Sequence, residues 1–66
     1  MTVAKVIEVI SEGETIEDAI QTAVREVAKT VKNVKQIDVM HIKGIVEKNK
    51  VKKYSVNCNI TFVVDR

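Results

Sequence analysis

The chain has 66 residues, of which 45% are hydrophobic, 30% charged and 3% aromatic, and its formal net charge is +2. This length excludes a second domain, and a core of this size offsets little more than the entropy lost on ordering the chain. A single Cys and a single His exclude an internal disulfide and a closed zinc site. We therefore expect one domain over residues 1–66 that gains stability by self-association.

The charges are spread along the chain as 11 Lys+Arg and 9 Asp+Glu, a pattern that argues against a nucleic-acid partner. No run of 18 apolar residues and no charged leader before an apolar stretch is present, so we expect neither a membrane span nor a signal peptide. The lone thiol suits a reducing compartment. These features predict a cytoplasmic protein.

Residues 3–10 predict a first strand with apolar residues on both faces, and 11–14 form a turn. Residues 15–31 predict a helix, because Thr15 and Asp18 have the spacing of a capping box and apolar residues recur every three or four positions. The helical stripe consists of Ile16, Ala19, Ile20, Ala23, Val24, Val27, Ala28 and Val31. Its small side chains indicate a close approach of the helix to a sheet.

Residues 34–46 predict a second strand, in which Gly44 suggests a bend or bulge. A polar loop over 47–50 has hairpin length, and 51–64 alternate between apolar and polar residues as a half-buried strand does. The order β-α-β-β defines the α+β class, with a three-stranded antiparallel sheet curved around one helix. Such a sheet leaves one face and two edges uncovered, and we expect subunit interfaces there.

The residues give little support for catalysis. His41 is the single candidate base, and regular strand alternation places Asp38, three residues earlier, on the opposite face. Cys58 falls on the apolar face of the last strand and is expected to be a buried hydrophobe. Neither a phosphate-binding glycine loop nor a metal-ligand spacing is present, so we expect no enzyme and no metal site.

The polar face of the last strand leaves two alternatives open. It is either a solvated surface, the commoner case, or a ligand-binding surface of a binding or scaffolding module. The ladder consists of Ser55, Asn57, Asn59 and Thr61.

Several segments, in this order and spacing, resemble the dodecins. They are Val3-Ala-Lys-Val-Ile-Glu-Val, Thr15-Ile-Glu-Asp-Ala-Ile-Gln, Lys29-Thr-Val-Lys-Asn-Val, Ile42-Lys43-Gly44, Lys53-Tyr54-Ser55-Val56 and Ile60-Thr-Phe-Val-Val. The resemblance covers nearly the whole chain. It implies a hollow homododecamer that binds riboflavin, FMN or FAD.

The resemblance also implies a site, at which this chain departs from the flavin-binding pattern. Gln36 stands where those dodecins have a stacking Trp, and Ser55 stands where they have a Gln that contacts the polar edge of the ring. Lys43 keeps the charge of a family Arg without its planar fork, and Val63 replaces a further Arg. The expected cofactor-binding residues are therefore Gln36, Lys43 and Ser55.

The departures support a second hypothesis beside flavin binding or storage. The dodecin family includes members that lack the aromatic residue, one group of which resembles a calcium-associated branch. The alternative is a flavin-independent scaffold, or a shell that binds an ion or another small ligand.

Overall fold

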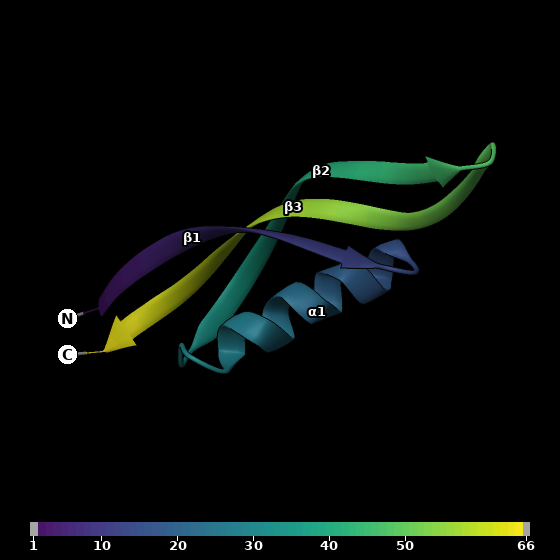
Figure 1. Ribbon diagram of the computed structural model, residues 1–66. Helices are drawn as coiled ribbons and strands as arrows, with labels where there is room; N and C mark the ends of the chain where they lie inside the picture. Colours follow the sequence, from purple (N-terminus) through teal and green to yellow (C-terminus); the bar gives the residue numbers. More distant parts are fainter. Residues whose placement is uncertain (1, 66) are drawn as a thin grey trace.

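The computed structural model describes residues 2–65, and it has the predicted order of elements (Figure 1). These are strand β1 (Thr2–Gly13), helix α1 (Ile16–Ala28), strand β2 (Val34–Glu47) and strand β3 (Lys50–Asp65). The sheet order is β1-β3-β2, and β3 is antiparallel to both neighbours. The predicted fold class is confirmed: three antiparallel strands and one helix in the order β-α-β-β.

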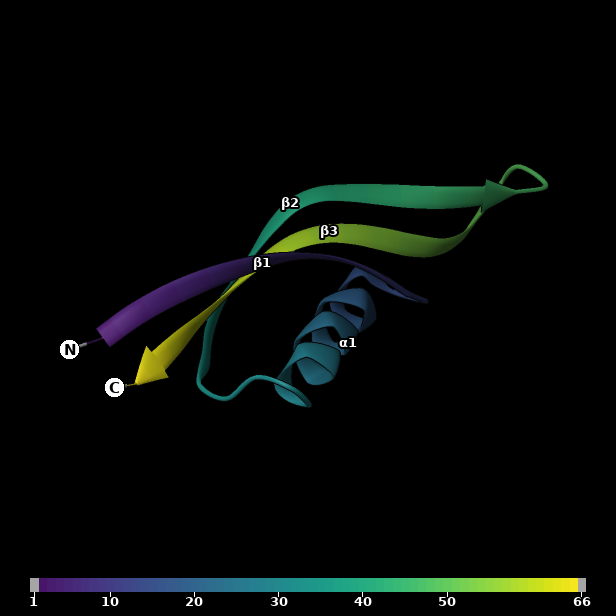
Figure 2. The ribbon, with the colours of Figure 1, turned by 60° about the vertical axis from the view of Figure 1, so that its left-hand side comes forward.

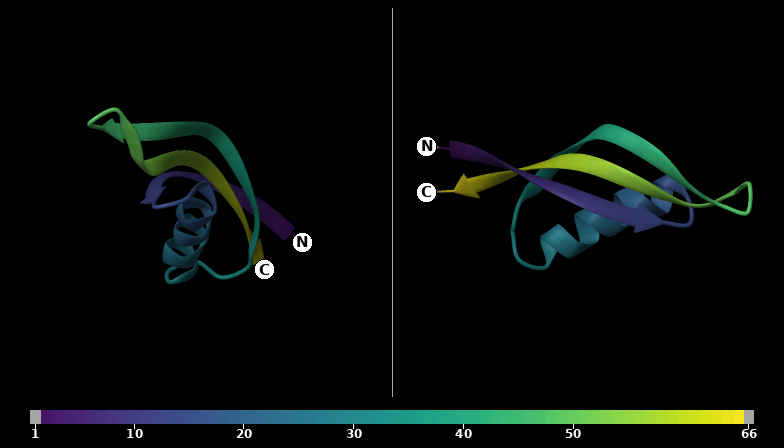
Figure 3. Two further views of the ribbon diagram at one scale, coloured as in Figure 1. Left: turned by 90° about the vertical axis from the view of Figure 1, so that its right-hand side faces the viewer. Right: turned by 45° about the horizontal axis from the view of Figure 1, so that its top comes forward.

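The sheet bends over α1, which lies on its concave side (Figures 2 and 3). The helix connects β1 to β2, the two outer strands, so it crosses beneath the central strand β3. The alternation in β3 explains its central position, because every second side chain of its middle part is buried: Val56, Cys58 and Ile60. No helix among residues 2–65 covers the other sheet face.

The start of α1 is fixed as the sequence predicts. Thr15 is the N-cap, with φ −130° and ψ 164°, and its Oγ1 accepts a hydrogen bond of 3.0 Å from the Asp18 backbone N–H. The carboxylates of Glu17 and Asp18 lie in the first turn, where the helix dipole favours negative charge. The cap and the dipole explain these residues without a functional role.

The helix ends at Ala28, three residues before the predicted end at 31. The backbone N–H of Lys29 donates to Glu26 O at 3.3 Å, and that of Thr30 donates to Val27 O at 3.1 Å. These contacts to the third preceding residue tighten the last turn. Val31 still packs against the core, so the apolar stripe extends past the helix itself.

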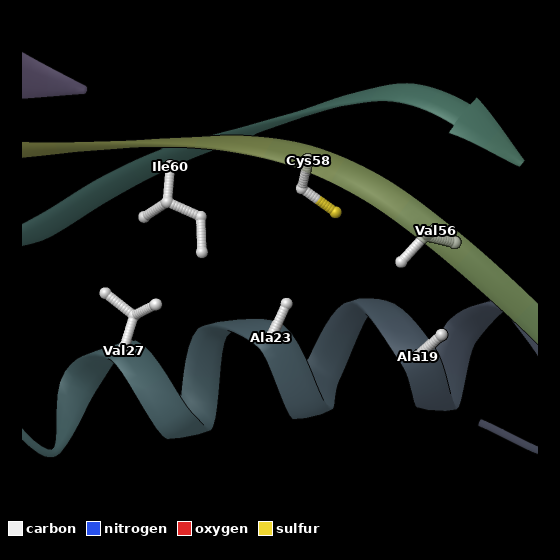
Figure 4. Close-up of a cluster of buried hydrophobic side chains, with 6 residues drawn as sticks. All are labelled: Ala19, Ala23, Val27, Val56, Cys58 and Ile60. Carbon is white, nitrogen blue, oxygen red and sulfur yellow. The ribbon is translucent and has the colours of Figure 1, made fainter. Parts of the chain in front are cut away.

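The core lies between α1 and β3 and is small (Figure 4). The helix contributes Ala19, Ala23 and Val27, which face the buried residues of β3. The small helical side chains bring backbone and sheet close together: a Cβ on Gly13 would lie 2.6 Å from Ala19 N. Glycine is therefore required where β1 turns under the sheet.

Register shifts in β2 change which of its side chains share a face. Lys35 and Met40 are each an extra residue opposite β3, and each bulge exchanges the faces of the residues that follow it. Val34 therefore packs against the core together with Ile37 and Val39, although regular alternation separates it from them. The irregularity expected at Gly44 lies one residue later, between Ile45 and Val46, with the extra residue on β3.

The isolated chain is more extended than a compact domain of its size. Its radius of gyration is 13.7 Å, against about 11 Å expected for 66 residues. Its accessible surface is 5064 Å², whereas a folded monomer of 7.4 kDa exposes about 4,200 Å². The large exposed hydrophobic residues are Val3, Val6, Ile10, Ile16, Met40, Ile42, Val46 and Val51. The shape leaves apolar surface without cover.

Candidate functional site

The candidate site lies on the sheet face opposite α1, which we call the far face. The register places its side chains in rows across β1, β3 and β2, because directly paired residues of antiparallel strands point to the same side. From the hairpin end the rows are Glu12–Ser55–Lys43, Ile10–Asn57–His41, Glu8–Asn59–Asp38 and Val6–Thr61–Gln36. The far face is therefore polar along its centre and has apolar or charged side chains along β1.

Two of the three predicted site residues are direct neighbours. Lys43 and Ser55 are paired across β2 and β3 and line a shallow hollow of about 30 Å³. Ile10, His41 and Asn57 complete its lining. Sequence reasoning did not assign these three residues to the site, although Asn57 belongs to the polar ladder of the last strand.

The third predicted residue, Gln36, lies elsewhere on the far face. It pairs with Thr61, six residues along β3 from Ser55, which is about 20 Å at the usual rise of a strand. Its Nε2 donates to Asp38 Oδ2 at 3.2 Å. Gln36 therefore cannot contact a ligand held by Lys43 and Ser55 of the same chain unless that ligand spans most of the far face.

One lining atom of the hollow lacks a partner among the described residues. The Oδ1 of Asn57 is buried and accepts no hydrogen bond, an arrangement that costs free energy unless a donor arrives. A ligand with an N–H or O–H group, or a second chain, would supply that donor. Asn57 thus marks the hollow as a place where a polar partner is expected.

A salt bridge borders this end of the far face. Lys53 Nζ lies 2.8 Å from Glu12 Oε1, and the hydrogen bond and charge of Glu12 raise the pKa of Lys53. Both side chains are about half exposed, so the pair contributes little to stability. It does hold the Lys53 ammonium next to the row that contains Ser55 and Lys43.

The prediction that Asp38 and His41 lie on opposite faces is wrong. The bulge at Met40 restores them to the same face, where Asp38 pairs with Asn59 and His41 with Asn57. The Asp38 carboxylate nevertheless accepts a hydrogen bond from Gln36. His41 lines the hollow together with Lys43, Ser55 and Asn57.

Other sequence-based expectations concern chemistry away from the hollow. Cys58 is a free and fully buried thiol, as predicted, and burial raises its pKa. Residues 2–65 contain no cluster of three or more His, Cys, Asp or Glu side chains suited to a metal ion. No helix among these residues has the length and apolarity needed to cross a membrane.

The architecture defines a class of protein: a curved three-stranded sheet on one helix, with uncovered edges and a polar far face. The family model described as Dodecin matches residues 3–65. The chain belongs to the dodecin family. Flavin binding and multimeric assembly are typical of this family.

Solved structures agree with this assignment. A variant of the Thermus thermophilus dodecin is 28% identical, with a TM-score of 0.92 and coverage of 100% of both chains. The Streptomyces coelicolor dodecin is 20% identical, with a TM-score of 0.90 over 98% of this chain and 94% of that one. The Streptomyces davaonensis dodecin, 15% identical, has a TM-score of 0.90 over 98% and 97%. The two Streptomyces structures support the fold alone. The search of curated proteins found no match.

Proposed function

We propose that the chain forms a closed homododecamer that binds or stores a flavin, which is riboflavin, FMN or FAD, in a modified pocket without a stacking Trp. The observation that carries this proposal is the incomplete hollow on the far face. Its volume is about 30 Å³, whereas pockets for ligands of this size have about 300–1,000 Å³. A second copy has to close the hollow before it can enclose a ring system.

In an assembly, predicted site residues of different copies can meet although those of one chain lie far apart. Gln36 is about 20 Å along the far face from Ser55, so a ligand at Lys43 and Ser55 would meet the Gln36 of another copy more readily than that of its own. In such a pocket Lys43 supplies a positive charge, Ser55 a short donor and acceptor, and Asn57 an acceptor that is buried and unpaired. These groups suit the polar edge of a flavin ring or its phosphate.

The proposed pocket binds flavin weakly. Stacking of a base on an aromatic side chain contributes about 1–3 kcal/mol in nucleic-acid systems, and by analogy its loss raises Kd by one to two decades. Gln36 has no aromatic face to replace that stacking. We therefore propose that the protein binds or stores a flavin and does not act as an enzyme. A cytoplasmic location stays a prediction from the lone thiol.

The alternative function is a flavin-independent dodecamer that serves as a scaffold or holds an ion or another small ligand. The absence of any Trp from the chain and the short side chain of Ser55 favour it. Both functions require assembly. They differ in what the far-face hollow contains.

Native mass spectrometry of protein purified without added cofactor tests assembly and occupancy together. Twelve chains of 7.4 kDa have a mass of about 89 kDa, as expected for a closed assembly. That mass with flavin adducts supports the proposed function, and that mass without adducts favours the alternative. A species of 7.4 kDa would contradict both.

Flavin titration of two proteins separates the two functions further. We expect riboflavin fluorescence to be quenched by the natural chain at tens of micromolar at most, and by Gln36→Trp/Ser55→Gln at concentrations about one to two decades lower, because the variant regains a stacking surface. Gln21→Trp is the matched control, since this exposed residue adds an indole on α1 instead of on the far face. Quenching by the double variant alone would contradict flavin binding and support the alternative.

A further inference from the structure

The hollow on the far face combines a histidine, a lysine and a polar acceptor that lacks a donor. His41 and Lys43 both line it, because residues two apart on a strand point to the same face. Asn57, whose Oδ1 is buried and accepts no hydrogen bond, is paired directly with His41. The chain has a single histidine, so this imidazole decides whether the hollow has one positive charge or two near neutral pH.

The size of the hollow favours a compact group. Its volume of about 30 Å³ is close to the space that one water molecule occupies in the liquid. A ring system does not fit into it within one chain, whereas a small head group fits against its mouth. The lining provides positive charge and the Ser55 hydroxyl, which suit a group with several anionic oxygens, such as a phosphate or a sulfate.

The groups that face His41 from β2 and β3 leave its imidazole without an acidic partner. On β2 the two neighbouring far-face charges are Lys43 and Asp38, and the Asp38 carboxylate accepts a hydrogen bond of 3.2 Å from Gln36 Nε2. The far-face residues of β3 from 55 to 61 are uncharged. Helix α1 lies on the concave side of the sheet (Figures 2 and 3), so its side chains do not face the hollow.

β1 presents two carboxylates, one in each row beside that of His41. Glu12 forms its salt bridge with Lys53, and Glu8 lies in the row on the other side. Adjacent rows are about 6.6 Å apart along a strand, so neither carboxylate lies directly opposite the imidazole. Among residues 2–65, neither His41 nor Lys43 forms a salt bridge. An anion from outside the chain would be the first direct partner of both cations.

We infer that the hollow binds an anionic oxygen group with an affinity that depends on the protonation of His41. A neutral imidazole has one N–H, and when this N–H donates to Asn57 Oδ1 the other ring nitrogen presents a lone pair to the anion. A protonated imidazole has two N–H groups and donates to Asn57 and to the anion at once. Lys43 supplies the second positive charge. The affinity for the anion therefore rises as the pH falls.

This inference rests on the proposed function only for the natural source of the anion. The phosphate of FMN and a free inorganic anion share the same oxygen chemistry. With a flavin in the pocket, the hollow distinguishes FMN from riboflavin, which has no phosphate, and does so more strongly at lower pH. The coupling is reciprocal, so a bound anion also raises the pH at which His41 loses its proton.

NMR of the imidazole tests the inference without a flavin, because the single histidine gives one C2 proton resonance to follow with pH. Sulfate stays a dianion throughout the titration. We expect about 20 mM sulfate to raise the midpoint by about 0.5 pH unit relative to sodium chloride of equal ionic strength, which is an about threefold preference for the protonated imidazole.

Two lysine variants show whether the hollow is the place where sulfate acts. Lys43→Gln should reduce the rise in the midpoint by half or more, because it removes the second positive charge from the hollow. Lys32→Gln is the matched control, since it makes the same change in charge at an exposed position in the α1–β2 connection, and it should keep the rise. A rise no larger than that in chloride, or an equal loss in the two variants, would overturn the inference.

Flavin titrations relate the hollow to the proposed function. Quenching of FMN and of riboflavin at about pH 8 and about pH 6 compares the natural chain with His41→Gln. We expect the ratio of the FMN Kd of the variant to that of the natural chain to increase about threefold between these pH values, while the riboflavin ratio stays constant. The FMN phosphate itself titrates at about pH 6, but it does so with both proteins and cancels in the ratio.

The inference and the proposed function fail in different ways. A sulfate-dependent rise in the midpoint without binding of either flavin would support the inference and contradict the proposed function. Binding of both flavins without a sulfate-dependent rise, and with an FMN ratio that is the same at both pH values, would support the proposed function and overturn the inference.

Discussion

At the scale of single residues, the buried thiol of Cys58 couples stability to alkaline pH. Burial raises its pKa above the ordinary value of 9.0, so the thiol of the folded chain keeps its proton to a higher pH than that of the unfolded chain. The contribution of the protonated thiol to the free energy of unfolding is fully present below pH 9. It falls as pH rises toward the folded pKa, by up to about 1.4 kcal/mol per pH unit. Urea unfolding from about pH 8 to 10 measures this loss.

Cys58→Ala isolates the contribution of the thiol. The substitution removes the sulfur and lowers the free energy of unfolding below pH 9, and the difference from the natural chain shrinks at higher pH because the variant has no thiol to titrate. The raised pKa of Lys53 acts in the same direction and stays in both proteins. Equal pH slopes for the natural chain and Cys58→Ala would show that the thiol does not contribute.

The residues of the candidate site show how far sequence reasoning extends. The resemblance to dodecins pointed to Lys43 and Ser55, and the register shows that they are neighbours. The places of Gln36 and His41 were not predictable, because bulges at Lys35 and Met40 shift the register. Neither Lys35 nor Met40 is a Gly or another residue type that indicates a bulge in a sequence.

At the scale of elements, the free energy of unfolding depends on the backbone conformation of the β2–β3 hairpin turn. Lys48 and Asn49 both have positive φ, 52° and 65°, which is the conformation of a two-residue type I′ turn. Gly at the second position relieves the left-handed strain, so Asn49→Gly should raise the free energy of unfolding by about 0.5 kcal/mol. Asn49→Val should lower it by about 1–2 kcal/mol, because β-branched residues fit this region poorly.

Thermal or urea unfolding of both variants at one chain concentration checks the prediction. The two substitutions leave all lysines of the β2–β3 hairpin in place, so a difference between the variants reports the backbone conformation of the turn. A Val variant as stable as the Gly variant would contradict the turn geometry.

The elements themselves were predictable because their signals are local. The helical stripe, the Thr15 cap and the alternation of β3 each depend on neighbouring residues. The end of α1 was not predictable, because the last turn tightens through backbone hydrogen bonds at Lys29 and Thr30 while Val31 continues the apolar pattern. Hydrophobic periodicity predicts which side chains are buried, and the buried side chains can continue beyond the last residue of a helix.

At the scale of the whole molecule, folding and assembly should be one equilibrium. Among the residues that the structure describes, the core contains six that are fully or nearly fully buried, and both outer strands have a free edge. A chain whose own core is this small depends on surface buried between copies, so mass action links its stability to concentration. We expect the midpoint of thermal unfolding to rise steadily over a hundredfold increase in chain concentration. Differential scanning fluorimetry of the natural chain at each concentration tests this. A midpoint independent of concentration would mean that the monomer is stable alone.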